Sequence, residues 1–192
     1  MIEVRWHGRG GQGAKTAALL LADAAFETGL YVQGFPEYGP ERMGAPITAY
    51  TRLDGEPIRI HSNIYEPDMV VIVDETLISA VDVRSGLKPG GRIVVNSNRK
   101  PGLISADFPG FDGEIYAVDA ADISMRNLGK NLPNTPLLSV VAKLTGIIGE
   151  AEFTRVMEGA FKKKFLTKQE VVTGNMNALR EAWNGAVLVN GN

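Results

Sequence analysis

The chain has 192 residues, with 20 lysines and arginines against 22 aspartates and glutamates, and hydrophobic residues make up 44% of it. This composition is typical of a globular domain, and the formal net charge of −2 gives no electrostatic reason to expect binding to nucleic acid or to an anionic membrane. The absence of cysteine excludes disulfides, thiolate nucleophiles and cysteine-ligated zinc or iron–sulfur sites within this chain.

The first residues, MIEVRWHGRGG, lack the basic region and apolar stretch of a secretory signal. No apolar run approaches the roughly 18 residues that predict a membrane span. We therefore expect a cytoplasmic protein.

The N-terminal pattern predicts a strand, a glycine-rich turn, a helix and a second strand. Residues 2–6 alternate between polar and apolar types, as in a half-buried strand. Four glycines follow within residues 8–13. Residues 14–28 have the apolar spacing of a helix, which we expect to end at Gly29, and residues 30–34 read as the second strand.

The next stretch, residues 35–46 (FPEYGPERMGAP), holds three prolines and two glycines, so we expect a loop without regular structure. Long ordered loops are disproportionately functional. Residues 47–53 alternate again, and Asp54-Gly55 is a hairpin turn signal. We therefore expect residues 57–60 to return as an antiparallel strand.

The remaining chain continues the alternation of strands and helices. We expect strands at 69–73, 92–96 and 114–118, and helices at 77–83, 120–128, 137–148, 150–161 and 168–183. This order predicts an α/β fold: a three-layer α/β/α Rossmann-like domain with a mostly parallel, mixed sheet and a helical C-terminal part.

The run Gly8-Arg9-Gly10-Gly11-Gln12-Gly13 matches G-x-G-x-x-G between a predicted strand and helix. Glycines allow a tight turn and close approach of a ligand, and the helix start offers free N–H groups to an anion. The structural alternative is a tight strand–helix turn without a ligand.

Two nucleotide-binding classes fit this turn poorly. A nicotinamide site needs an acidic residue at the end of the second strand, where residues 31–34 are Tyr, Val, Gln and Gly and Glu37 comes late. In a nucleotide-hydrolysing P-loop the lysine follows the last glycine, whereas here Ala14 stands before Lys15.

Three further features have ordinary structural explanations beside functional ones. The pair Glu41-Arg42 lies between prolines and could present a guanidinium from a rigid loop, or belong to a solvated surface loop. Asn134 or Thr135 would cap the start of a helix. His7 and His61 have no second ligand at metal spacing, so we expect no metal site.

Four motifs lie in the order found in one family. They are GRGGQG at 8–13, FPEYGPERMGAP at 35–46, LPNTPLL at 132–138 and NMNALREAW at 175–183. With them the chain resembles the gamma subunits of 2-oxoacid:ferredoxin oxidoreductases over nearly its whole length, as one gamma-type domain over residues 1–192. The Met43-Gly44-Ala45-Pro46 version is most similar to the pyruvate enzymes (pyruvate synthase, or pyruvate:ferredoxin oxidoreductase).

The resemblance implies a subunit that is not a complete catalyst alone. The enzyme would convert pyruvate, coenzyme A and oxidised ferredoxin to acetyl-CoA, CO2 and reduced ferredoxin. Thiamine diphosphate and [4Fe–4S] clusters would lie in partner subunits, named alpha, beta and delta, and this chain would contribute to the coenzyme A site and to assembly. The candidate ligand-contacting residues are Gly8, Arg9, Gly10, Gly11, Gln12, Gly13, Glu41, Arg42, Asn134 and Thr135.

Other functions stay open at this point. The chain could serve a related 2-oxoacid:ferredoxin oxidoreductase, be a stand-alone Rossmann-type nucleotide-binding protein, or be a purely structural subunit. We expect the 35–46 loop to order against a partner, with Arg42 making a charge-assisted contact. Isolated chains could pair as a homodimer through apolar patches left by missing partners.

Overall fold

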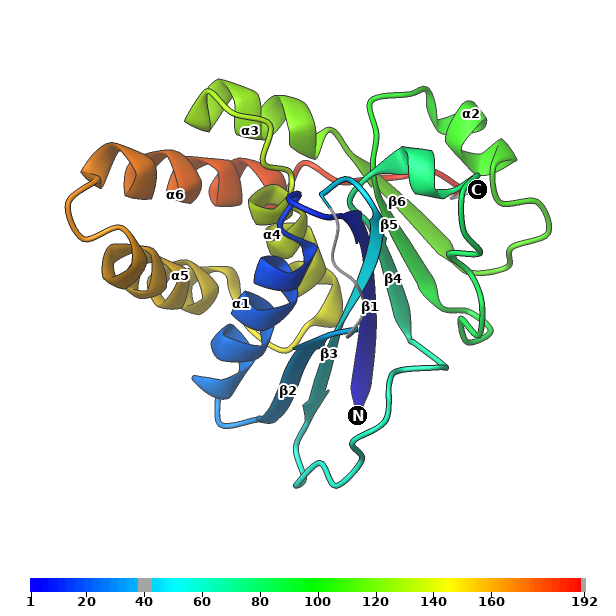
Figure 1. Cartoon of the computed structure of the whole chain (residues 1–192), viewed down its shortest axis with the longest axis horizontal. Helices are drawn as coiled ribbons and strands as arrows, with labels where there is room; N and C mark the ends of the chain where they lie inside the picture. The colour runs from blue at the N-terminus through cyan, green and yellow to red at the C-terminus, as the bar shows by residue number, and fades with distance from the viewer. Residues whose placement is uncertain (38–42, 191–192) are drawn as a thin grey trace.

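The computed structural model describes residues 1–37 and 43–190 of the chain. Their strands form one seven-stranded sheet of order β2-β3-β1-β4-β5-β6-β7 (Figure 1). The strands are β1 (Ile2–Arg9), β2 (Tyr31–Pro36), β3 (Pro46–Asp54), β4 (Met69–Ile72), β5 (Arg92–Asn96), β6 (Glu114–Val118) and β7 (Val187–Leu188). The central strands β1, β4, β5 and β6 are parallel, while β3 runs antiparallel between β2 and β1, and β7 is antiparallel to β6.

Helices cover the two faces of the sheet unequally. They are α1 (Ala14–Phe26), the 3-10 turn η1 (Glu75–Leu77), α2 (Pro101–Ala106), α3 (Ala120–Leu128), α4 (Asn134–Thr145), α5 (Glu150–Lys164) and α6 (Gln169–Trp183). On one face α1 and α4 pack against the strands, with α3, α5 and α6 packed on these two helices (Figure 1). The opposite layer is thin, and its apolar side chains come from η1, α2 and the turns that follow each of them. The α/β class, mixed sheet and helical C-terminal part are confirmed.

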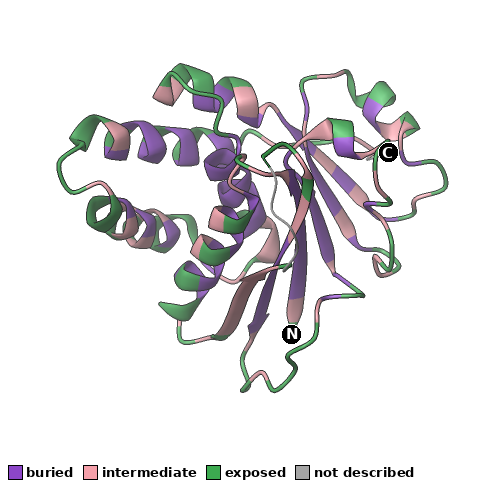
Figure 2. Cartoon of the chain, viewed as in Figure 1, coloured by how far each residue is buried: buried purple, intermediate pink, exposed green. Residues whose placement is uncertain are grey.

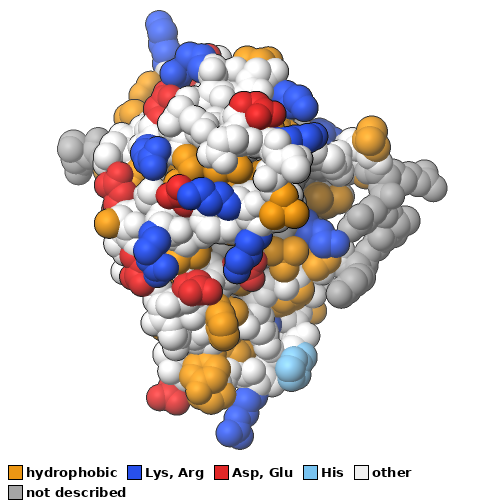
Figure 3. Space-filling model, turned by 90° about the vertical axis from the view of Figure 1, so that its left-hand side faces the viewer, with side chains coloured by type: hydrophobic (Ala, Val, Ile, Leu, Met, Phe, Trp, Pro, Cys, Tyr) orange, Lys and Arg blue, Asp and Glu red, His pale blue; other side chains and the backbone are white. Residues whose placement is uncertain are grey.

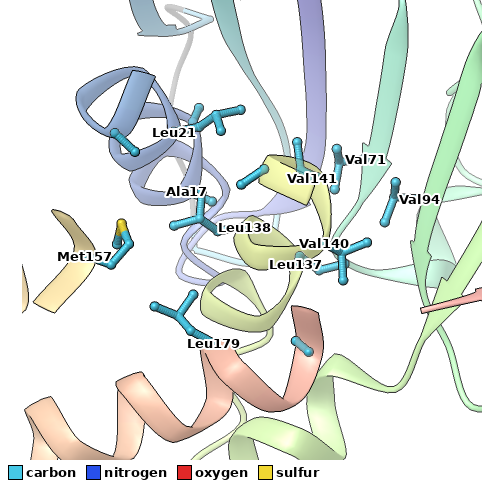
Figure 4. Close-up of a cluster of buried hydrophobic side chains, with 14 of the residues drawn as sticks. Ala17, Leu21, Val71, Val94, Leu137, Leu138, Val140, Val141, Met157 and Leu179 are labelled. Atoms are coloured by element: carbon cyan, nitrogen blue, oxygen red, sulfur yellow. The ribbon is translucent and has the colours of Figure 1, made fainter. Parts of the chain in front are cut away.

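The main core lies between the sheet and the thicker helical layer, where the buried parts of helices and strands meet (Figure 2). Figure 4 shows Leu137 and Val140 of α4 pointing toward Val71 and Val94 of the sheet. In α4 every residue from Asn134 to Ala142 is buried, which explains why most of this segment is apolar. Burying a Leu or Val side chain stabilises the fold by about 1.5–3 kcal/mol relative to leaving it exposed. The packing of α4 therefore contributes strongly to the stability of the fold.

The outer surface of the helical layer carries acidic and basic side chains mixed with hydrophobic ones (Figure 3). No large area of a single sign of charge is visible on this face, in keeping with the near-neutral composition. Among the described residues, no helix has the length and apolar character needed to cross a lipid bilayer.

The hairpin expected over residues 47–60 is wrong. The β3 strand pairs instead with β2 (Tyr31 opposite Asp54) and with β1 (Ile2 opposite Leu53), and residues 57–60 are not a strand. Both edges of β3 are therefore occupied by strands distant in sequence, and no edge remains for a hairpin partner.

The helix expected at 77–83 is also wrong. Only η1 forms, and turns follow it. The Asp82 carboxylate accepts a hydrogen bond from the Arg84 amide at 3.1 Å, a local contact that competes with helix formation.

The loop over 35–46 is shorter than predicted at both ends. Strand β2 continues to Pro36 and β3 begins at Pro46, since proline is tolerated at the ends of strands. The short elements α2 and β7 are additional to the prediction.

Candidate functional site

The glycine-rich turn lies at the carboxyl end of β1, where the chain order of the sheet reverses. From β1 the chain passes through α1 to β2 and β3 on one side, whereas β4 lies on the other side. Ligands of open α/β sheets bind at such switch points, outside the carboxyl ends of the parallel strands. A crevice of about 270 Å³ opens here, lined by polar side chains that follow β4, β5 and β6 and by Gln12 of the turn.

The glycines of the turn meet different requirements. A Cβ at Gly8 would lie 2.9 Å from the Ala14 Cβ, so this glycine allows close packing of strand and helix. Gly11 and Gly13 have φ angles of 96° and 81°, which other residues rarely adopt. Gly13 occupies the N-cap of α1, whereas Gly11 is exposed, and a Cβ added to it would meet no described atom within 4 Å. The backbone at Gly11 is therefore open to an approaching group.

The start of α1 supplies the attraction for an anion. The first amides of any α-helix have no acceptor within the helix, and the helix dipole places partial positive charge there. In α1 these amides belong to Ala14, Lys15 and Thr16, and the Lys15 side chain beside them is exposed. This end of α1 can hold a phosphate or carboxylate group through the backbone.

Arg9 is engaged in shaping the turn. Its Nη2 donates to the Thr76 Oγ1 at 2.8 Å, its Nη1 donates to the Gly44 carbonyl at 3.2 Å, and its Nε lies 3.3 Å from an Asp74 carboxylate oxygen. Gln12 donates to the same carboxylate at 2.7 Å and accepts from the Arg9 amide at 2.8 Å. Because Asp74 already neutralises Arg9, the positive potential left for a ligand comes mainly from the helix start.

The Asp74 carboxylate stays ionised in this network. Burial by itself would raise the pKa of Asp74, but hydrogen bonds from Thr76 and Gln12 and the charge of Arg9 bring that pKa below its ordinary value. Asp74 and Thr76 were not predicted from the sequence. Their only signal was their position directly after the apolar strand at 69–73, where polar residues face the carboxyl edge of a sheet.

Part of the proline-rich segment joins the turn. The Gly10 amide donates to the Ala45 carbonyl at 2.9 Å, and the Gly44 amide donates to the Gly10 carbonyl at 3.1 Å. Thus residues of two separate motifs, more than 30 positions apart in sequence, form one backbone structure. Glu41 and Arg42 lie outside the described residues, and their role stays a prediction.

The LPNTPLL motif brings Asn134 to the same place. A Cβ on Gly13 would lie 2.7 Å from the Asn134 Cγ, so this side chain packs against the N-cap of α1. Asn134 is only 8% exposed, and its amide makes no hydrogen bond with any described residue. Thr135 points elsewhere, since its hydroxyl donates to the Asn175 side chain at 3.0 Å. Asn134 therefore joins the candidate site, whereas Thr135 links α4 to α6.

The helix-capping role expected for Asn134 or Thr135 is wrong. Helix α4 begins at Asn134 itself, with Pro133 in the N-cap position and no side-chain cap. Both residues are thus inside the first turn of the helix.

The fold also argues against a nicotinamide site. Strand β2 ends at Pro36, and the first acidic residue after it is Glu37. The Glu37 carboxylate accepts a hydrogen bond from the Tyr50 hydroxyl at 3.2 Å. The carboxylate that comes first after β2 is therefore engaged by Tyr50, which disfavours its use in holding a ribose hydroxyl.

Comparison with known proteins gives consistent results. The family model described as pyruvate ferredoxin/flavodoxin oxidoreductase matches residues 3–184. The chain is similar to the pyruvate/ketoisovalerate oxidoreductases common subunit gamma of Thermococcus kodakarensis, with 44% identity over 188 residues, which is 98% of each chain.

Two solved structures are also similar. The crystal structure of pyruvate oxidoreductase subunit PORC from Thermotoga maritima has a TM-score of 0.82 and 38% identity, and the match covers 97% of each chain. A 2-oxoglutarate:ferredoxin oxidoreductase from Magnetococcus marinus, solved with 2-oxoglutarate, coenzyme A and succinyl-CoA bound, has a TM-score of 0.66 and 20% identity. That match covers 94% of this chain and 30% of the other, and at this identity it shows a shared fold.

Proposed function

Because the chain belongs to the pyruvate ferredoxin/flavodoxin oxidoreductase family and is a gamma subunit of the pyruvate synthase or pyruvate-ketoisovalerate type, we propose that it binds coenzyme A for a multi-subunit enzyme. The reaction consumes pyruvate, coenzyme A and two oxidised ferredoxins. It yields acetyl-CoA, CO2, two reduced ferredoxins and one proton. In this proposal the partner subunits, alpha, beta and delta, hold the thiamine diphosphate and the iron–sulfur clusters.

The observation that carries the coenzyme A proposal is the convergence of Gly11, Gly13 and Asn134 at the start of α1. Coenzyme A carries phosphates, and the turn offers helix-start amides beside an open backbone position at Gly11. The Asn134 side chain packs against Gly13, and its amide can donate to one of the same oxygens. Arg9 and Asp74 hold the turn in shape.

The shared naming of a relative supports the same assignment. The Thermococcus kodakarensis protein is named as a gamma subunit common to pyruvate and ketoisovalerate oxidoreductases. A subunit shared by two enzymes that oxidise different 2-oxoacids is expected to bind a compound that both reactions use. Coenzyme A would be such a compound. We infer that this chain contacts coenzyme A and leaves the choice of 2-oxoacid to other subunits.

The role proposed for the chain is binding and positioning. Its own residues hold a phosphate group, and no bond of pyruvate is broken at this turn. The competing hypothesis is a purely structural subunit, in which the turn only joins β1 to α1.

Reconstitution tests the proposal. The tagged chain should co-purify with the partner subunits, and coenzyme A-dependent pyruvate oxidation should require its presence. A chain that stays monomeric beside these subunits, or a complex that oxidises pyruvate equally well without it, would contradict the proposal.

A further inference from the structure

The first turn of α4 is held in place by contacts with neighbouring helices. Pro133 occupies the N-cap position, and its side chain makes no capping hydrogen bond to the helix amides. The next two residues point in different directions, because Asn134 packs against Gly13 at the start of α1 whereas Thr135 bonds to α6. Adjacent residues of a helix are rigidly connected through the backbone. Whatever fixes Thr135 therefore also fixes Asn134.

The partner of Thr135 is itself fixed in orientation. The Thr135 hydroxyl donates to the Asn175 Oδ1 at 3.0 Å, and both side chains are buried. The Asn175 Nδ2 donates to the Val171 carbonyl at 2.8 Å, one turn earlier in α6. Because a carbonyl can only accept, this second bond determines which end of the amide faces Val171. Asn175 therefore presents its oxygen to Thr135 in a single orientation.

Helix α6 is a rigid support for this contact. A Cβ on Gly174 would lie 2.5 Å from the Asn127 carbonyl oxygen, so glycine at this position lets α6 lie directly on α3. The Asn127 Nδ2 also donates to a Glu181 carboxylate oxygen at 2.9 Å. Asn175, next to Gly174, is therefore placed by the packing of two helices. Buried polar pairs such as Thr135 with Asn175 favour one arrangement, because a displacement leaves polar groups unpaired.

The segment before α4 is anchored to α3. The Ser124 hydroxyl accepts from the Leu132 amide at 3.0 Å and donates to the Ala121 carbonyl at 2.9 Å. Asn131 and Pro133, on either side of Leu132, line the crevice at the carboxyl ends of the parallel strands. The start of α4 therefore borders both this crevice and the glycine-rich turn, and its position shapes both.

These contacts connect two sequence motifs to the candidate site. LPNTPLL supplies Asn134 and Thr135, and NMNALREAW supplies Asn175. We propose that Asn175 is a positioning residue for coenzyme A binding. Through Thr135 it holds Asn134 and the start of α4 against Gly13, beside the helix-start amides of α1. This inference rests on the proposed function, and it names a residue that acts on that site without touching the ligand.

The contact that Asn175 supports has little tolerance for movement. The Cγ, Nδ2 and Oδ1 atoms of Asn134 all lie within 3.0 Å of a Cβ built on Gly13, so the whole amide packs closely on the N-cap of α1. Displacements of about 1 Å are enough to weaken a preorganised site strongly. Releasing the start of α4 should therefore weaken the binding of coenzyme A, while the binding of pyruvate, which this turn does not contact, stays unchanged.

The test compares Asn175→Ala with Ser139→Ala in the assembled enzyme. Ser139 lies one turn farther along α4, and its buried hydroxyl donates to the Leu179 carbonyl of α6 at 2.7 Å, so it is a matched link between the same helices. Both variants should lower the melting temperature of the isolated chain. Only Asn175→Ala should raise the apparent KM for coenzyme A, by roughly 5-fold or more, with the KM for pyruvate near its wild-type value. Thr135→Val, which is similar in shape, should act like Asn175→Ala, whereas Thr135→Ser keeps the hydroxyl and should retain the wild-type KM.

Several outcomes would overturn the inference. If Asn175→Ala and Ser139→Ala raise the KM for coenzyme A equally, the cause is a general loosening of α4 and no positioning role remains for Asn175. If Asn175→Ala does not assemble, Thr135→Val takes its place in the comparison, and a wild-type KM in that complex overturns the inference. Gly11→Val separates the two levels of the argument. If it raises the KM for coenzyme A and Asn175→Ala does not, only the positioning role fails, whereas if neither does, the proposed function fails as well.

Discussion

The side chain of Asn134 lies directly against Gly13, so the first residues of α4 and α1 meet at one point. A Cβ on Gly13 would be 2.7 Å from the Asn134 Cγ and 2.9 Å from its Nδ2. Gly13 also has a φ of 81°, in the left-handed region that favours glycine. This position therefore needs glycine for two independent reasons.

Replacing Gly13 with alanine should destabilise the isolated chain by roughly 2 kcal/mol or more. The new Cβ would strain the backbone and also clash with the Asn134 side chain, and the two energetic costs add. Gly29→Ala is the matched control, because Gly29 has a φ of 85° with open space around a Cβ, and it should cost about 1 kcal/mol. Chemical denaturation measures both. The double variant Gly13→Ala/Asn134→Ala should recover part of the loss, and failure to recover any would contradict the packing argument.

Removing the Arg9 side chain should loosen the turn. Arg9→Ala eliminates hydrogen bonds to Thr76 and Gly44 and leaves Asp74 without its cation, so we expect a loss of about 1–2 kcal/mol in unfolding free energy. Lys15→Ala, at an exposed position next to the same turn, should change stability by less than about 0.5 kcal/mol. Equal stabilities of the two variants would show that the Arg9 network does not support the turn.

His7 should make stability depend on pH. Its pKa is about 4 in the folded chain against an ordinary value of 6.5, because burial disfavours the charged ring. Between these values the unfolded chain binds a proton that the folded chain does not, so stability falls as the pH is lowered through this window, by roughly 3 kcal/mol in total. His7→Gln, which keeps an acceptor for Arg5, should remove this part of the pH dependence. Parallel pH profiles for wild type and variant would refute the assignment.

The strand and helix pattern was predictable where one periodicity ran uninterrupted. The strands at 92–96 and 114–118 and the helix at 120–128 have the predicted bounds, since alternating or apolar runs end there at turn residues. The pattern failed where partners distant in sequence decide the outcome. Strand β3 pairs with β1 and β2 and not with the residues after Asp54, and a local turn signal contains no information about that choice.

The candidate site was predictable in part for similar reasons. The position of the glycine-rich turn could be predicted from the glycine motif, because tight turns and positive φ angles strongly favour glycine. The ion pair between Arg9 and Asp74 could not be predicted from the sequence. It forms because β1 and β4, two neighbouring parallel strands, end at the same edge of the sheet. The contact of Asn134 with Gly13 depends likewise on how α4 packs beside α1. Glu41 and Arg42, together with the ordering expected of their loop, remain predictions outside the described residues.

The most direct test of the coenzyme A proposal is steady-state kinetics of the assembled enzyme carrying Gly11→Val, with Gly29→Val as the matched control. Both glycines have positive φ and open space around a Cβ, but they lie at opposite ends of α1. After circular dichroism and subunit assembly are shown to be unchanged, Gly11→Val should raise the apparent KM for coenzyme A on the order of 10-fold while leaving that for pyruvate near its wild-type value, because the side chain blocks close approach to the backbone. Gly29→Val should change neither constant. A Gly11→Val complex with wild-type coenzyme A dependence would contradict the proposal and identify the glycine-rich segment as a structural turn.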